Sequence, residues 1–198
     1  MHRGEKLNNK GFTLIELLAV VVILAVVMGI AMTNVLSAMN KARAGSLSDS
    51  ATSVSRAFNE KYTESLVDGV PTGVYSDVLG SGNGYDFSST GAYKITKGLE
   101  AELNISPSTY LLDDATKGSA ITITSNAMTT DTSFVYYNSV KGSFTICMIA
   151  NPTGNNYVAG NIKPTGTTIT IDGVTVTLNE KTSGKGVMYA CSNGLKSW

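Results

Sequence analysis

Residues 12–32 read FTLIELLAVVVILAVVMGIAM, a run in which Glu16 is the only charged side chain. As an α-helix this run would be roughly 32 Å long, which is enough to cross the hydrocarbon core of a bilayer. A carboxylate within such a span costs roughly 2.5–3.5 kcal/mol on insertion scales, so Glu16 is expected to have a partner. The run therefore predicts a long apolar helix in which the charge of Glu16 has a function.

Three other interpretations of this run compete. A secretory signal peptide has a shorter apolar region followed by small residues at a cleavage site, whereas the helical pattern here continues beyond Met32. A plain membrane anchor does not account for Glu16. A core helix buried on all sides is disfavoured, because the remainder of this chain is too small to surround an apolar run of 21 residues.

The run follows the polar leader MHRGEKLNNKG, residues 1–11. Together, Lys10-Gly11-Phe12-Thr13-Leu14-Ile15-Glu16-Leu17-Leu18 resemble the processing signature of type IV pilins and related pseudopilins. The resemblance implies cleavage between Gly11 and Phe12 by a prepilin peptidase on the cytoplasmic side of the membrane, followed by N-methylation of Phe12. Glycine suits the position before the scissile bond, because the backbone approaches a protease closely when no Cβ stands in the way.

The resemblance also assigns a partner to Glu16. In an assembled filament, Glu16 of one subunit would meet the new amino group of Phe12 of its neighbour and so set the axial register of the helices. Such a pair adds little net stability, since desolvation offsets its Coulomb energy, but the loss of one partner leaves a charge unpaired. The chain lacks the proline that many relatives carry in this helix: its first proline is Pro71, and Gly29 is the comparable weak point.

Residues 33–66 predict an amphipathic continuation of the helix. Their apolar side chains recur at steps of three, four or multiples of these, at Leu36, Met39, Leu47, Ala51, Val54, Phe58, Tyr62 and Leu66. Asp68-Gly69 followed by Pro71 is a stop signal. We therefore expect one nearly continuous helix over 12–66, apolar all round in its first half and on one side in its second. A coiled coil throughout is the alternative.

Residues 67–118 predict mostly irregular structure, with a short helix at Lys97–Leu103. The glycine-rich stretch Gly80–Gly84 predicts a surface connection, since a phosphate-binding loop needs a preceding strand and a following helix. Asp113-Asp114 could be an acidic ligand pair, but a solvated turn is the favoured interpretation.

From Ala120 the pattern predicts strands, at Ala120–Thr124, Phe134–Tyr137, Ser143–Ile149, Thr168–Ile171, Val174–Leu178 and Val187–Cys191. Asp172-Gly173 is a strong hairpin turn signal because a two-residue turn needs positive φ. Alternation places Ile169 and Ile171 on one face of this hairpin and threonines on the other. We expect one face to cover the amphipathic half of the helix.

Cys147 and Cys191 are too far apart for a CxxC redox or metal motif. In an exported domain they predict one disulfide, whereas two reduced, buried thiols are the alternative. Closing a loop of about 45 residues would contribute about 4 kcal/mol in the chain-entropy model. The bridge would fasten the C-terminal edge strand to the sheet.

The expected fold class is α+β, a pilin-like long N-terminal α-helix packed on a C-terminal antiparallel β-sheet head. The expected organisation is a removed leader at 1–11, a transmembrane and filament-core helix half at 12–32, and an amphipathic helix half at 33–66. A globular head at 67–198 follows, comprising an αβ-loop, the sheet and a C-terminal disulfide loop.

Composition argues against an enzyme. The single histidine is His2, in the leader, so the mature chain would lack histidine-based acid–base chemistry and the common histidine zinc sites. No nucleophile–base constellation is recognisable. The sequence predicts no catalytic residues, no cofactor and no metal. The formal net charge of zero shows no electrostatic footprint for nucleic acid.

The expected function is a structural subunit of a type IV pilus, serving adhesion, aggregation, motility or DNA uptake. Expected partners are copies of itself in a helical filament, the prepilin peptidase and the pilus assembly machinery. The precursor would lie in the cytoplasmic membrane as a single-pass protein with a cytoplasmic leader, and the mature subunit in an extracellular pilus. A minor pilin, a secretion or competence pseudopilin, and a membrane-anchored binding domain that never polymerises remain alternatives.

Overall fold

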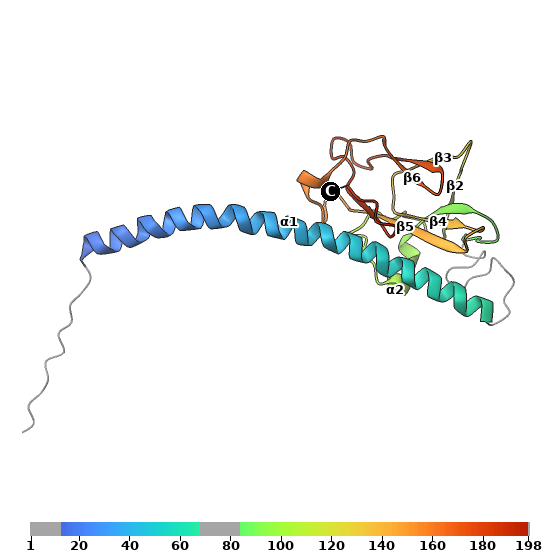
Figure 1. The fold of residues 1–198 in the computed structure, drawn as a ribbon, viewed down its shortest axis with the longest axis horizontal. Helices are drawn as coiled ribbons and strands as arrows, with labels where there is room; N and C mark the ends of the chain where they lie inside the picture. The colour runs from blue at the N-terminus through green and yellow to red at the C-terminus, as the bar shows by residue number, and fades with distance from the viewer. Residues whose placement is uncertain (1–12, 68–83, 198) are drawn as a thin grey trace, which may run out of the picture. The chain divides into compact units, whose positions relative to one another are not determined.

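The structure, a computed structural model, describes residues 13–67 and 84–197, without the side chains at positions 33, 65 and 66. It contains helix α1 (Leu14–Val67), the short helices η2 (Lys97–Leu99), α2 (Glu100–Leu103) and η3 (Ala159–Asn161), and eight described strands. The strands are β1 (Gly91–Lys94), β2 (Ala120–Ile121), β3 (Ala127–Thr130), β4 (Phe134–Asn138), β5 (Ser143–Ile149), β6 (Thr167–Ile171), β7 (Val174–Leu178) and β8 (Tyr189–Cys191). The predicted α+β fold class, a long N-terminal helix packed on an antiparallel sheet, is confirmed (Figure 1).

The chain divides into two compact units, one up to Lys41 and one from Ala42 onward. Helix α1 contributes to both. Its second half is rich in serine and threonine, which elsewhere compete with helical hydrogen bonds. Here several of these hydroxyls donate to the carbonyl four residues earlier, as Ser50 Oγ does to Ser46 O at 2.9 Å and Thr63 Oγ1 to Asn59 O at 2.9 Å. These hydroxyls are therefore hydrogen-bonded within the helix itself.

A five-stranded sheet with the order β2-β1-β4-β5-β8 forms the centre of the second unit. All of its neighbouring strands are antiparallel. Successive side chains of a strand point to opposite faces, and both faces of β4 and β5 are buried. Phe144, Ile146 and Met148 of β5 belong to one apolar cluster, and Cys147 and Ile149 to another.

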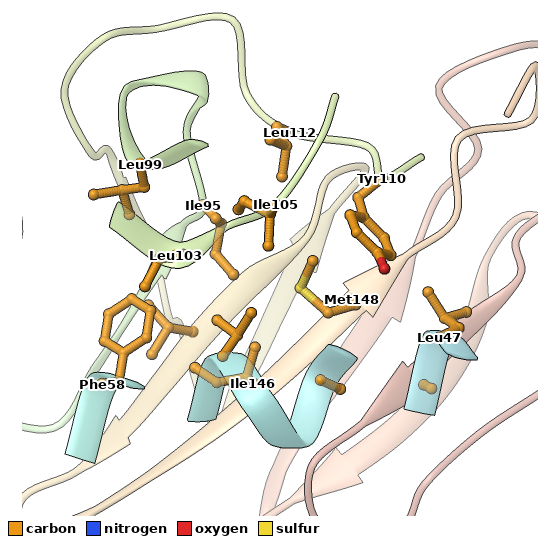
Figure 2. Packing of buried hydrophobic residues seen from close by; sticks show 14 of the residues in the cluster. Leu47, Phe58, Ile95, Leu99, Leu103, Ile105, Tyr110, Leu112, Ile146 and Met148 are labelled. Carbon is orange, nitrogen blue, oxygen red and sulfur yellow. The ribbon is translucent and has the colours of Figure 1, made fainter. Parts of the chain in front are cut away.

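Helix α1 covers the first face of this sheet. Leu47, Ala51, Val54 and Phe58 follow one another at steps of three or four residues, and each is at most 2% exposed. Figure 2 shows Leu47 and Phe58 extending from the helix into the cluster that also contains Ile146 and Met148 of the sheet. The predicted apolar stripe is therefore correct for this part of the helix.

A smaller sheet, with the order β3-β7-β6, covers the other face. The β6–β7 hairpin confirms the Asp172-Gly173 turn, since both residues have positive φ, 49° and 86°. The expectation that this hairpin covers the helix was wrong: Ile169 and Ile171 pack in the cluster of Cys147 on the opposite face of the main sheet. The physical reason is that the central strands are apolar on both faces, so each face needs its own cover.

The prediction that 67–118 is mostly irregular overlooked β1, which lies inside that range. Its sequence, GAYK, has little intrinsic strand preference, but β2 and β4 pair with it on both sides. Strand β3 was also overlooked, and it pairs with β7 in parallel. The expected strand at 120–124 is shorter, ending at Ile121, and that at 187–191 begins at Tyr189. The short helix over 97–103 is confirmed by η2 and α2.

Cys147 and Cys191 form a disulfide between the paired strands β5 and β8. They are directly opposite each other in the register, with their Cα atoms 4.0 Å apart, and both are at most 1% exposed. Strand β8 is the edge of the main sheet, so the bond fastens that edge from inside the second apolar cluster.

Replacement of both cysteines by alanine is expected to lower the free energy of unfolding by about 4 kcal/mol, because the unfolded chain loses a cross-link across 44 residues. Urea unfolding of the detergent-solubilised chain, followed by near-ultraviolet circular dichroism, measures this change. The matched control is wild-type protein whose Cys147–Cys191 disulfide is reduced once the chain has unfolded. An unchanged unfolding midpoint would contradict the assignment.

Candidate functional site

The first part of α1 presents apolar side chains on every side. An 18-residue window of this helix reaches a mean hydropathy of 3.0, and none of it is buried. Leu14 is 83% exposed, Ile23 62% and Met32 67%. By length and composition this helix could cross a membrane. Exposed apolar surface on this scale marks a membrane or a protein interaction site, because single exposed apolar residues do not form such a continuous surface.

The exposed apolar surface continues beyond the run at 12–32. Val35, Leu36 and Met39 are 55%, 53% and 45% exposed. Among the side chains of the helix that the structure describes, Ala44 is the first that is fully buried. Leu36 and Met39, which the apolar stripe predicted to continue the packed side, are therefore not covered by described residues. We call residues 14–39 the apolar segment.

Glu16 lies at the beginning of α1, where it is part of a capping box with Thr13. One carboxylate oxygen of Glu16 accepts hydrogen bonds from the backbone N–H and the hydroxyl of Thr13, both at 2.8 Å. The Thr13 hydroxyl in turn accepts from the Glu16 backbone N–H at 3.3 Å. This reciprocal arrangement satisfies donors that the first turn of a helix otherwise leaves unpaired.

Thr13 is the functional residue that our sequence reasoning missed. The signal was present, since Thr13-Leu14-Ile15-Glu16 matches the capping-box pattern Ser/Thr-x-x-Glu. Gly11 and Phe12, the predicted processing residues, lie outside the described residues. The pairing of Glu16 with Phe12 of a neighbouring subunit therefore stays a prediction.

Asp113 and Asp114 each lie beside lysine side chains. Asp113 lies 3.5 Å from Lys94, whereas Asp114 contacts Lys97 at 2.7 Å and Lys181 at 3.6 Å. The hydrogen bond from Lys97, together with the charge of Lys181, lowers the pKa of Asp114 below its ordinary value. Among the described residues no group of three or more His, Cys, Asp or Glu side chains could hold a metal ion.

Residues 6–32 match the family model of the prokaryotic N-terminal methylation motif. No curated protein and no solved structure matches the chain. The matched residues include the whole predicted processing site, the Thr13–Glu16 capping box and most of the apolar segment. This chain therefore carries the N-terminal signature of type IV prepilins.

Proposed function

We propose that this chain is a structural subunit of a type IV pilus, made as a membrane-anchored precursor and polymerised through its N-terminal helix into an extracellular filament. The observation that carries the proposal is the apolar segment, which follows directly on a prepilin processing motif and is not covered by any described part of the chain. The proposed role is structural and non-catalytic.

The hydrophobic effect is the driving force for assembly. Apolar surface is stable in the bilayer as long as the precursor remains there. A subunit that leaves the membrane must bury the same surface elsewhere, and side-by-side packing with identical helices does this. At roughly 25 cal/mol per Å², leaving this many large side chains in water would be strongly unfavourable, so a subunit outside the bilayer needs such packing.

Exposed apolar residues after Met32 lengthen the helix surface that would pack against neighbouring subunits. Leu36 and Met39 lie on the same helix as the buried stripe but before its first buried member. In a filament these residues would pack against a neighbouring subunit. The head, held by its own core and disulfide, would form the outer surface used for adhesion, aggregation, motility or DNA uptake.

Electron microscopy of sheared surface material from producing cells, with N-terminal sequencing of its main band, tests the proposal. We expect thin filaments whose subunit begins at Phe12. Processed chain found only in the membrane fraction, without filaments, would instead indicate an anchored domain that does not polymerise.

Gly11→Glu is expected to leave full-length precursor in the membrane, because a bulky charged side chain next to the scissile bond prevents close approach of the peptidase. Intact-mass measurement of the membrane fraction detects the retained leader. Gly11→Ala, which adds a single methyl group, is the matched control and should be processed at least in part. Normal removal of residues 1–11 from the Gly11→Glu chain would refute the processing claim.

Glu16→Ala is expected to be processed but to yield few filaments, since the amino group of Phe12 then lacks its counter-charge. Glu16→Gln separates the two roles of this side chain, because glutamine keeps a capping box but carries no charge. We expect Glu16→Gln to assemble as poorly as Glu16→Ala.

Thr13→Ala removes the capping hydroxyl and retains the charge of Glu16, so it should still form filaments. Quantification of sheared filaments relative to total processed subunit measures all three variants. Wild-type filament yield from Glu16→Gln would show that capping, and not charge pairing, is the role of Glu16.

A further inference from the structure

The head contains one sequence motif that the filament function does not use. Asn104-Ile105-Ser106 is the only Asn-x-Ser/Thr triplet in the chain with a residue other than proline in the middle, since Asn151-Pro152-Thr153 has the excluded proline. This triplet is the acceptor pattern for N-glycosylation of exported proteins. Such a triplet often occurs by chance, so its position in the structure must show whether it can be a modification site.

The turn after α2 presents both functional side chains of the triplet to solvent. Asn104 ends α2 in the left-handed conformation, with φ 50° and ψ 47°, and its backbone N–H donates to Glu100 O. The N–H of Ile105 donates to the same carbonyl at 3.1 Å. Ile105 is buried at 6% exposure, which anchors the turn, while Asn104 and Ser106 on either side are exposed.

The side-chain amide of Asn104 makes no hydrogen bond to any residue in the described ranges. Its backbone conformation is one that asparagine tolerates better than most residues, so the position requires no side-chain interaction to hold it. The amide nitrogen is therefore available for reaction.

A hollow of about 270 Å³ adjoins Asn104, between this turn and α1. The wall from α1 carries four polar side chains beside the apolar Val54, namely Ser46, Asp49, Ser50 and Ser53. Hydroxyl and carboxylate groups are the hydrogen-bonding partners that a sugar needs. The hollow thus provides a polar surface along which a first sugar on Asn104 can lie.

We propose that Asn104 is an N-glycosylation site whose first sugar packs in this serine-lined hollow. The donor is a lipid-diphosphate-linked oligosaccharide, used by a membrane-bound transferase on the exported side. A bond forms between Asn104 Nδ2 and the anomeric carbon of the first sugar, and the bond from that carbon to the diphosphate oxygen breaks. The lipid diphosphate leaves with the bonding electrons, and the amide nitrogen loses one proton to solvent. The reaction requires export of the head but not filament assembly.

Mass spectrometry of tryptic peptide 98–117, taken from full-length chain in the membranes of producing cells, tests the proposal. Wild type and Ser106→Thr are expected to carry a glycan that fragment spectra locate on Asn104. Asn104→Asp, which retains tolerance for the left-handed conformation, and Ser106→Ala are expected to lack it. An intact disulfide and an unchanged circular dichroism spectrum control for folding of each variant.

Two results would overturn the proposal. One is an unmodified peptide 98–117 from wild-type cells. The other is a glycan located on Ser106, Ser108 or Thr109 with Asn104 unmodified. Because the peptide is read from membrane-held chain, the outcome does not depend on whether filaments form.

Discussion

The need to keep the apolar segment of α1 away from water is the constraint on which the membrane-anchored state and the proposed filament both depend. Large apolar side chains from Leu14 to Met39 are exposed in the isolated chain. A bilayer would cover most of them in a membrane-anchored precursor, and neighbouring helices would cover them in the proposed polymer. A lone soluble subunit has neither cover. The same surface therefore accounts for both the membrane-anchored state and the proposed filament.

Glu16 is the one charged side chain in the apolar run, and the structure gives its carboxylate hydrogen-bond partners. In the single chain its carboxylate is occupied by Thr13, so the charge does not stand without hydrogen bonds at the beginning of the helix. Intrasubunit capping and intersubunit pairing are compatible in principle, because a carboxylate has more acceptor sites than the two Thr13 donors use. The capping box therefore describes how the acid is held before assembly, and pairing with Phe12 describes its proposed partner afterwards.

The head answers a different packing requirement. Its central strands β4 and β5 are buried on both faces, and α1 covers only one of them. The β6–β7 hairpin and β3 supply the second cover, and the Cys147–Cys191 disulfide lies in the cluster that this cover closes. The core of the head is thus complete without the apolar segment, which leaves that segment available for other contacts.

Local pattern alone determined the features that depend on neighbours in the chain. These are the apolar run and its single acid, the N-terminal methylation motif, the long helix, the short helix over 97–103 and the Asp172-Gly173 turn. Each follows from periodicity, turn chemistry or a short motif that acts over a few residues. Only the tertiary structure decided which face the β6–β7 hairpin covers, that GAYK is a strand, and that β3 pairs with β7 in parallel. These features depend on partners many residues away in the chain. An alternating strand has the same apolar face whether it packs on the helix or on the sheet, so its sequence alone does not show which of the two it contacts.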